Sequence, residues 1–175
     1  MSALEAIREK LPDAARDIRL NLQNVMDSQN LSADQRWGVA LACAFSARNV
    51  ELRDAFVADA KAAGVSDALF EDAKAAAVMM GMNNVYYRFR HYMGESSTYH
   101  TMRANLRMQR LASVATNKVD FELFSLAASS INGCETCVKS HESVVRQGGL
   151  SDQAVHDAVR IAATVYAAAV ALELG

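Results

Sequence analysis

Four residues in the second half of the chain have the types and spacing of a redox site. Cys134 and Cys137 form a Cys-x-x-Cys pair, His141 follows four residues after the second cysteine, and Glu122 precedes the pair. Helical positions four apart share a face, so the His141 imidazole can reach the Cys137 thiol and take its proton. Glu122, on the preceding expected helix, can orient that histidine or accept its proton.

The place of the pair at the start of an expected helix favours thiolate chemistry. The unpaired N–H groups and the helix dipole stabilise a thiolate there and lower its pKa. The sulfurs of Cys134 and Cys137 are also close enough in sequence to close a small disulfide ring. We therefore expect a redox-active dithiol.

Two other interpretations of the same residues stay open. Cys134, Cys137, His141 and Glu122 are all zinc-ligand types, although structural zinc sites usually draw their ligands from two separated pairs. A Cys-x-x-Cys can also arise without a function. A thioredoxin-like site is disfavoured, because no alternation of strands and helices surrounds the pair.

Other candidate reactive residues have plainer interpretations. We expect Cys43 to be a small buried hydrophobic residue and His156 to be a solvated helix residue. Three arginines are expected on one face of a helix over residues 101–111, as a solvated or subunit-contact stripe: Arg103, Arg107 and Arg110.

Composition restricts the class of protein. Of 175 residues, 51% are hydrophobic and 22% charged, with a net charge of -2, which excludes a disordered chain. Three cysteines do not make a disulfide framework, and 18 basic against 20 acidic residues give no footprint for nucleic acid. The longest apolar stretch, residues 161–172, is shorter than the ~20 residues of a spanning helix. No targeting segment is visible, so we expect a cytoplasmic protein that neither spans nor binds a membrane.

The chain predicts a single all-α domain over residues 1–175 with no β-sheet. It has one proline, eight glycines and many strong helix formers. Ser2 with Glu5, and Ser32 with Gln35, have the spacing of capping boxes at helix starts. The expected helices cover residues 2–12, 13–29, 51–63, 66–93, 101–111, 121–131 and 134–147. Two more begin at Ser32 and at Ser151.

An internal repeat connects the two halves of the chain. At an offset of 85 residues, Gly64-Val-Ser66-Asp67 aligns with Gly149-Leu-Ser151-Asp152, where one helix stops and the next is capped. We expect two related three-helix units over approximately residues 32–81 and 117–172.

At the same offset of 85 residues, three residues of the candidate site align with apolar residues in the first half of the chain. Glu122, Cys137 and His141 align with Trp37, Leu52 and Phe56. The second unit should therefore carry polar groups on its inward face, where they need one another as partners. Cys134 aligns with the polar helix-start residue Asn49, and we expect it nearer the surface.

The motif Glu-x11-Cys-x-x-Cys-x3-His resembles that of the alkyl hydroperoxide reductase D (AhpD) family, within the carboxymuconolactone decarboxylase-like superfamily. The likeness extends over nearly the whole chain, through residues 80–86, 106–108, 121–124 and 130–134. It implies an AhpD-like helical fold and a homotrimer, or a hexamer as in some relatives.

The resemblance also implies a function and roles for the site residues. It implies weak peroxidase activity and transfer of electrons from a lipoylated acyltransferase and lipoamide dehydrogenase to a peroxiredoxin of the alkyl hydroperoxide reductase C type. No cofactor would be bound, and a lipoyl dithiol would be the external reductant. Cys137 would become the sulfenic acid, Cys134 would be the proton donor and disulfide partner, and Glu122 and His141 would deprotonate Cys137. Some members have a second histidine where this chain has Thr136, so the relay would rest on Glu122 and His141 alone.

These observations predict a hydroperoxide-reducing dithiol protein. One alternative is a redox-sensing or adaptor protein, whose disulfide would form reversibly without turnover of peroxide. The other is a lyase of the same superfamily. Such relatives generally lack the cysteine pair, so the pair itself disfavours a lyase.

Overall fold

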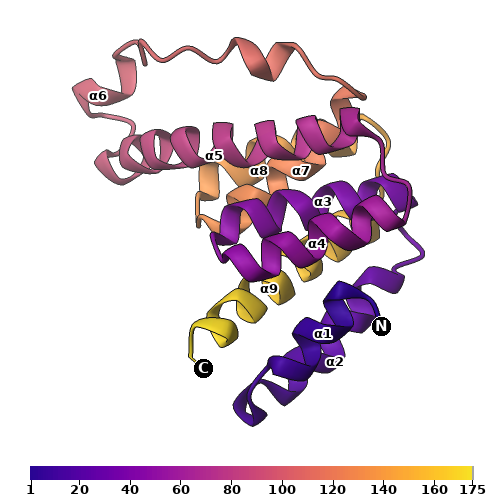
Figure 1. Cartoon of the computed structure of the whole chain (residues 1–175). Helices are drawn as coiled ribbons and strands as arrows, with labels where there is room; N and C mark the ends of the chain where they lie inside the picture. Colours follow the sequence, from indigo (N-terminus) through magenta and orange to yellow (C-terminus); the bar gives the residue numbers. More distant parts are fainter. Residues whose placement is uncertain (175) are drawn as a thin grey trace.

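The structure is a computed structural model that describes residues 1–174. Within that range it contains α-helices and short 3₁₀ turns and no β-strand, which confirms the all-α prediction (Figure 1). The helices are α1 (Ala3–Lys10), α2 (Arg16–Asn24), α3 (Ala33–Ala47), α4 (Val50–Ala62), α5 (Asp67–Met93), α6 (Thr98–Thr101), α7 (Lys118–Ile131), α8 (Glu135–Gln147) and α9 (Asp152–Glu173).

Capping serines start the helices where the sequence predicts them. Ser2 and Ser32 form complete capping boxes with Glu5 and Gln35. The side chain of Ser66 accepts the N–H of Leu69 at the start of α5, and Ser151 caps α9 in the same way. Each cap satisfies an N–H group that would otherwise lack an intrahelical partner.

Two expected helices are wrong in extent. Residues 13–29 form a shorter helix, α2, between 3₁₀ turns over Asp13–Ala15 and Val25–Asp27. Residues 101–111 do not form one helix: α6 ends at Thr101, and only a 3₁₀ turn over Gln109–Ala112 follows. Asn105 adopts a left-handed φ of 51°, which a continuous helix does not allow. The expected arginine stripe is therefore absent, because Arg103 and Arg107 share no helix.

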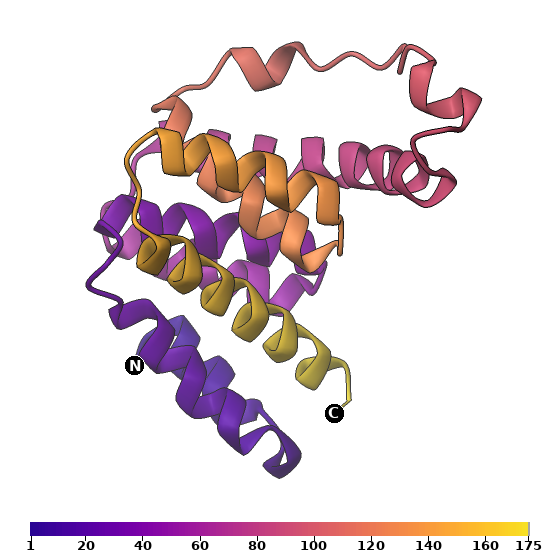
Figure 2. The same cartoon turned by 180° about the vertical axis from the view of Figure 1, so that it is seen from behind.

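The core lies where α3 crosses α5, α7 and α9. Helices α1 and α2 form a hairpin against α4 and α9 on one side of this core, and α8 packs against α7 and α5 on the other (Figures 1 and 2). The largest fully buried side chains include Leu41, Phe56, Phe121, Phe124 and Ile161.

A long connection joins α5 to α7. It comprises residues 94–117, and we call it the arm. It leaves the end of α5, passes through α6 and the turn Gln109–Ala112, and returns along α5 to the start of α7 (Figure 1). Most of the arm has no regular structure, yet it brings Met108 and Leu111 against the candidate site.

The helix boundaries keep the offset of 85 residues on which the repeat hypothesis rests. Helices α3, α4 and α5 begin at Ala33, Val50 and Asp67, and α7, α8 and α9 each begin 85 residues later. The hydrogen bond from Gln35 Nε2 to Asp120 Oδ1, at 2.8 Å, joins two positions that are also 85 residues apart.

Asp72, on α5, holds the end of the arm. Its side chain is fully buried and accepts hydrogen bonds from Arg110, from the backbone N–H groups of Ala115 and Thr116, and from the Thr116 hydroxyl, at 2.7–3.0 Å. Burial alone would raise the pKa of Asp72, but these donors outweigh it and hold the pKa below its ordinary value.

Asp157, at the repeat-related position on α9, does the same for the segment before α3. It accepts hydrogen bonds from Ser28 at 2.6 Å, from Asn30 at 2.8 Å and from Arg160 at 2.9 Å. Its burial opposes ionisation, yet these donors lower the pKa of this carboxyl too. Each aspartate thus fixes the entry of the chain into the other unit.

One helix within residues 1–174, α9, is long and apolar enough to cross a membrane by length and composition. Half of its most apolar window is buried inside the molecule, against α2, α3 and α7. Packing of this kind is what a core helix requires.

Candidate redox site between α5, α7 and α8

The turn between α7 and α8 fixes the position of the first cysteine. Gly133 adopts φ +67°, and the N–H groups of Gly133 and Cys134 bond to the carbonyls of Ser130 and Ser129. This is a Schellman motif, in which glycine supplies the left-handed residue at low cost. Cys134 then serves as the N-cap residue of α8. The Cys-x-x-Cys pair therefore sits at a helix N-terminus, as the sequence predicts.

The structure joins Cys134 and Cys137 in a disulfide and leaves Cys43 free and buried. The two Cα atoms of the bridge are 5.3 Å apart. Burial raises the pKa of the Cys43 thiol and keeps it protonated. Cys43 therefore has the environment of a small hydrophobic core residue.

The expectation that Cys134 lies nearer the surface is wrong. Cys134 is 0% exposed, whereas Cys137 is 6% exposed and lines a cavity. The expectation came from its alignment with Asn49, and Asn49 is itself only 8% exposed. The Asn49 side chain is buried because it caps the N–H of Leu52 and donates to Glu173. A polar residue at this helix start is paired rather than solvated.

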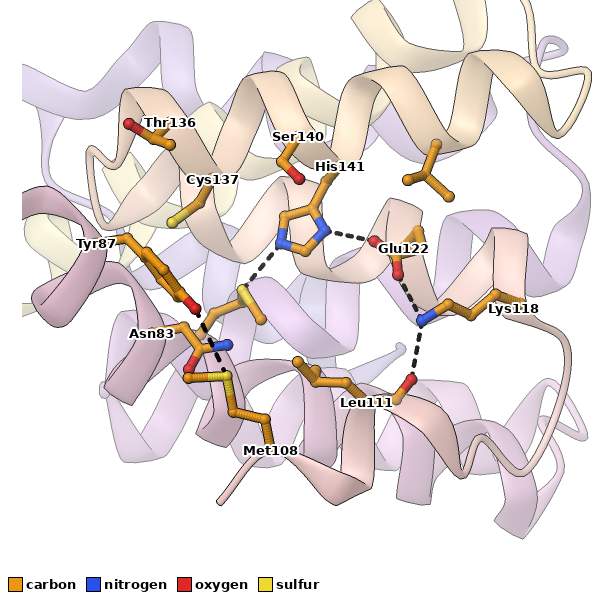
Figure 3. A pocket seen from close by; sticks show the side chains of 12 residues that line it. Asn83, Tyr87, Met108, Leu111, Lys118, Glu122, Thr136, Cys137, Ser140 and His141 are labelled. Atoms are coloured by element: carbon orange, nitrogen blue, oxygen red, sulfur yellow. Dashed lines mark hydrogen bonds and ion pairs between the residues drawn. The ribbon is translucent and has the colours of Figure 1, made fainter. Parts of the chain in front are cut away.

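Glu122 and His141 form a hydrogen-bonded pair at the cavity that Cys137 also lines. Nδ1 of His141 lies 2.5 Å from Oε2 of Glu122, and both side chains are nearly buried (Figure 3). The other carboxylate oxygen of Glu122 lies 2.6 Å from the ammonium of Lys118, one turn earlier on α7. Burial alone would raise the pKa of Glu122, but its bonds to His141 and Lys118 outweigh it and lower the pKa.

The second nitrogen of His141 faces sulfur. Nε2 lies 3.2 Å from the Sδ of Met80, a residue of α5 that is 1% exposed. A thioether is a weak acceptor, so it holds the ring in place without competing strongly for its proton. The imidazole is thus fixed between a carboxylate on α7 and a thioether on α5, and it lines the same cavity as Cys137.

A cavity of about 390 Å³ opens against this group (Figure 3). Its walls come from α5, the arm, α7 and α8, and Cys137 is the only one of the two disulfide cysteines among its lining residues. The lining residues are Met80, Asn83, Tyr87, Met108, Leu111, Lys118, Glu122, Thr136, Cys137, Ser140, His141 and Val144.

The corresponding region of the first unit is filled with apolar side chains. Leu52 and Phe56, which align with Cys137 and His141, are fully buried, and Trp37 is partly buried against the core. The second unit has a carboxylate, a cysteine sulfur and an imidazole in these places. A packed core in one unit therefore corresponds to a lined cavity in the other.

Most cavity residues were not predicted from the sequence as parts of the site, and three of them make or offer polar or sulfur contacts there: Lys118, Met80 and Asn83. Lys118 lies four residues before Glu122, and this helical spacing was a usable signal. Met80 and Asn83 come from α5, about fifty residues before the cysteine pair, and no spacing rule links them to it.

The zinc interpretation has no convergent ligand set. Among residues 1–174, no three His, Cys, Asp or Glu side chains converge as metal ligands. The Cys134 and Cys137 sulfurs are bonded to each other, and the ring nitrogens of His141 face Glu122 and Met80.

Known proteins resemble this chain over its full length. The sequence model of the carboxymuconolactone decarboxylase family matches residues 98–174 of this chain. A protein of Anaeromyxobacter dehalogenans named alkyl hydroperoxide reductase AhpD is 62% identical over 99% of this chain and 92% of its own length. Proteins of the same name from another Anaeromyxobacter and from Brucella canis are 58% and 44% identical, over 100% and 98% of this chain and 94% and 97% of their own lengths. With such similarity across the whole sequence, the chain belongs to the AhpD family of the carboxymuconolactone decarboxylase-like superfamily.

Proposed function

We propose that this protein is a dithiol peroxidase that reduces alkyl hydroperoxides through Cys137 and Cys134. The observation that carries the proposal is the contact of Glu122 with His141 at the wall of the cavity that Cys137 lines. Relatives named alkyl hydroperoxide reductase AhpD give independent support.

The oxidative half of the cycle begins with both cysteines reduced. His141, oriented by Glu122, takes the proton of the Cys137 thiol, and the thiolate attacks the outer oxygen of the hydroperoxide. The O–O bond breaks, an S–O bond forms, and the alkoxide leaves as an alcohol with the proton that His141 received. The Cys134 thiol then displaces water from the Cys137 sulfenic acid and closes the disulfide.

The reductive half needs an external dithiol, for which we propose a lipoyl group. Its thiolate attacks Cys137, because that sulfur faces the cavity while Cys134 is fully buried. Cys134 is then the leaving thiolate, and its place at the N-cap of α8 stabilises the departing charge. The second thiol of the lipoyl group displaces Cys137 and leaves as a cyclic disulfide.

The partners and the assembly form part of the same proposal. Electrons would come from a lipoylated acyltransferase and lipoamide dehydrogenase and pass on to a peroxiredoxin of the alkyl hydroperoxide reductase C type, in the cytoplasm. We propose a homotrimer, because α5 and the arm carry large apolar side chains that are exposed in the single chain. These side chains are Val78, Val85, Phe89, Tyr92, Met93, Tyr99, Met102 and Leu106.

Peroxide consumption with dihydrolipoamide as the sole reductant tests the function. The wild-type protein should turn over many equivalents of cumene hydroperoxide, and Cys137→Ala should abolish turnover. Cys43→Ala is the matched control, since Cys43 is buried away from the cavity and should be dispensable. A reversible disulfide without turnover would instead indicate a redox sensor or adaptor.

A further inference from the structure

Asn83 is a buried amide without a partner. It lies on α5 and is 5% exposed, and its side-chain oxygen makes no hydrogen bond within residues 1–174. Leaving a buried polar group unpaired costs free energy, because its bonds to water are lost without replacement, so such groups are rare in folded proteins. Asn83 lines the cavity that also holds Cys137 and His141 (Figure 3).

The next residue shows how this helix otherwise treats a buried amide. Asn84 is 1% exposed, donates to the Ser129 hydroxyl at 2.9 Å and accepts from the Asn132 amide at 2.9 Å. Those bonds tie α5 to the end of α7. Asn83 contributes no such bond, so fold stability gives no reason for an amide at this position.

The chemistry of the cavity supplies a reason. We propose that the Asn83 side chain binds the –O–O–H group of the hydroperoxide and presents it to Cys137, an inference that rests on the proposed function. A carboxamide offers one acceptor and one donor side by side. A hydroperoxide offers the complementary pair, an O–H donor on its outer oxygen and an acceptor on the adjacent inner oxygen.

The same contact acts during bond cleavage. When the Cys137 thiolate attacks the outer oxygen, the O–O bonding electrons move to the inner oxygen, where negative charge develops. The Asn83 N–H group donates to that oxygen until the proton from His141 converts the alkoxide to an alcohol. The alkyl group then lies among the apolar lining residues Met80, Met108 and Leu111.

The test separates the two half-reactions in Asn83→Leu, which has a similar volume and no hydrogen-bonding group. Pre-reduced protein is mixed with cumene hydroperoxide, and the loss of thiols is measured in a single turnover. Oxidised protein is mixed separately with dihydrolipoamide. We expect oxidation to slow about 100-fold, the typical effect of removing a preorganised donor, and reduction to stay within about twofold. The melting temperature should be unchanged or higher, because an unpaired polar group has been removed.

Two comparisons exclude a merely structural role. The oxidation defect should have the same size with hydrogen peroxide, since both substrates carry O–O–H, whereas an altered cavity shape would affect the bulky substrate more. Asn84→Ala is the matched control and should lower the melting temperature, because it removes one buried and one partly buried hydrogen bond.

Different outcomes would refute the role of Asn83 and the proposed peroxidase function. Oxidation of Asn83→Leu at the wild-type rate, or equal losses in both half-reactions, would refute the role of Asn83 while leaving the proposed function intact. If the hydroperoxide fails to oxidise wild-type protein, the proposed function and this subsite are both wrong.

Discussion

Glu122 keeps its negative charge in a nearly buried site because His141 and Lys118 share its two oxygens. His141 and Lys118 each bind one of its oxygens, and together they lower its pKa despite burial. The carboxylate is therefore ionised at neutral pH. In the proposed mechanism it stabilises the imidazolium that forms when Cys137 loses its proton, so that Glu122 and His141 act on that proton as one unit.

Single substitutions in this unit should therefore cost about as much as both together. We expect Glu122→Gln and His141→Asn each to slow oxidation by peroxide about a hundredfold, the usual contribution of a general base. The double variant should be little slower than either single variant, as measured by single-turnover thiol loss.

Disulfide formation with a strong oxidant serves as the control for these variants, and it should stay intact. Losses that multiply in the double variant would show that the two side chains act independently. Unfolding of Glu122→Gln would show that the carboxylate has only a structural role.

The burial of the two cysteines predicts which thiol reacts first with a bulky reagent. In the reduced protein, a short pulse of a maleimide should modify Cys137 before Cys134, because only Cys137 lines the cavity. Peptide mass spectrometry locates the label. Modification of Cys134 first would reverse the direction in which the lipoyl dithiol attacks.

The four motif residues could be predicted from the sequence, but the burial and the neighbouring side chains of the site could not. Helical spacing alone places His141 near Cys137, and the offset of 85 places Glu122 on an inward face. The burial of Cys134 was mispredicted, because the sequence does not show that Asn49 is buried by its own hydrogen bonds. Asn83 was missed because an unpaired amide is recognised only in three dimensions.

At the scale of elements, α3 and α7 cross closely at a glycine. A Cβ atom at Gly38 would overlap the ring of Phe124, which is fully buried in the core. The ring has no free space to move into, since protein interiors are close-packed. The crossing therefore requires the absence of a side chain at residue 38.

Gly38→Ala should destabilise the protein by about 2 kcal/mol, as overpacked cores do. Gly81→Ala is the matched control, because no atom lies within 4 Å of a Cβ at that α5 position. It should be neutral or should stabilise the helix by up to about 1 kcal/mol. Urea unfolding of both variants measures the difference, and equal stabilities would show that α3 and α7 have room to adjust.

The contact of α5 with the arm through Asp72 should depend on pH. Its pKa in the folded protein lies below the ordinary value of about 3.9, so the ionised carboxylate stabilises the fold above that pH. This contribution is lost as the pH falls through the ordinary value towards the lowered one.

Asp72→Asn should therefore cost about 3 kcal/mol at pH 7, and the cost should shrink below about pH 4. Asparagine would direct its NH₂ group at N–H donors of Ala115 and Thr116. Urea unfolding at pH 7 and at lower pH measures the difference. A pH-independent loss would mean that packing, rather than charge, holds the arm.

Most elements could be predicted, and the arm shows why the rest could not. Ser66 and Gly94 mark the start and stop of α5, and the structure ends the helix there. Residues 101–111 contain helix formers, but short helices need an apolar face packed on the body. The path of the arm is fixed instead by its hydrogen bonds to Asp72 and by the contacts of Met108 and Leu111, which depend on distant parts of the chain.

At the scale of the whole molecule, the apolar surface of α5 and the arm predicts self-association. We expect a trimer by light scattering, and Tyr92→Glu should weaken it, since Tyr92 is 74% exposed. Leu20→Glu is the control, because Leu20 is exposed on α2, away from that surface. A monomeric wild-type protein would contradict the proposed assembly.

The aspartates at positions 72 and 157 have a consequence for cooperativity. Asp72, in the first unit, holds the chain that enters the second, and Asp157, in the second unit, holds the chain that enters the first. Opening either unit would therefore release an anchor of the other. We therefore expect the two units to unfold together in one transition, and we expect slow hydrogen exchange in α3 and α7 to report the same global event.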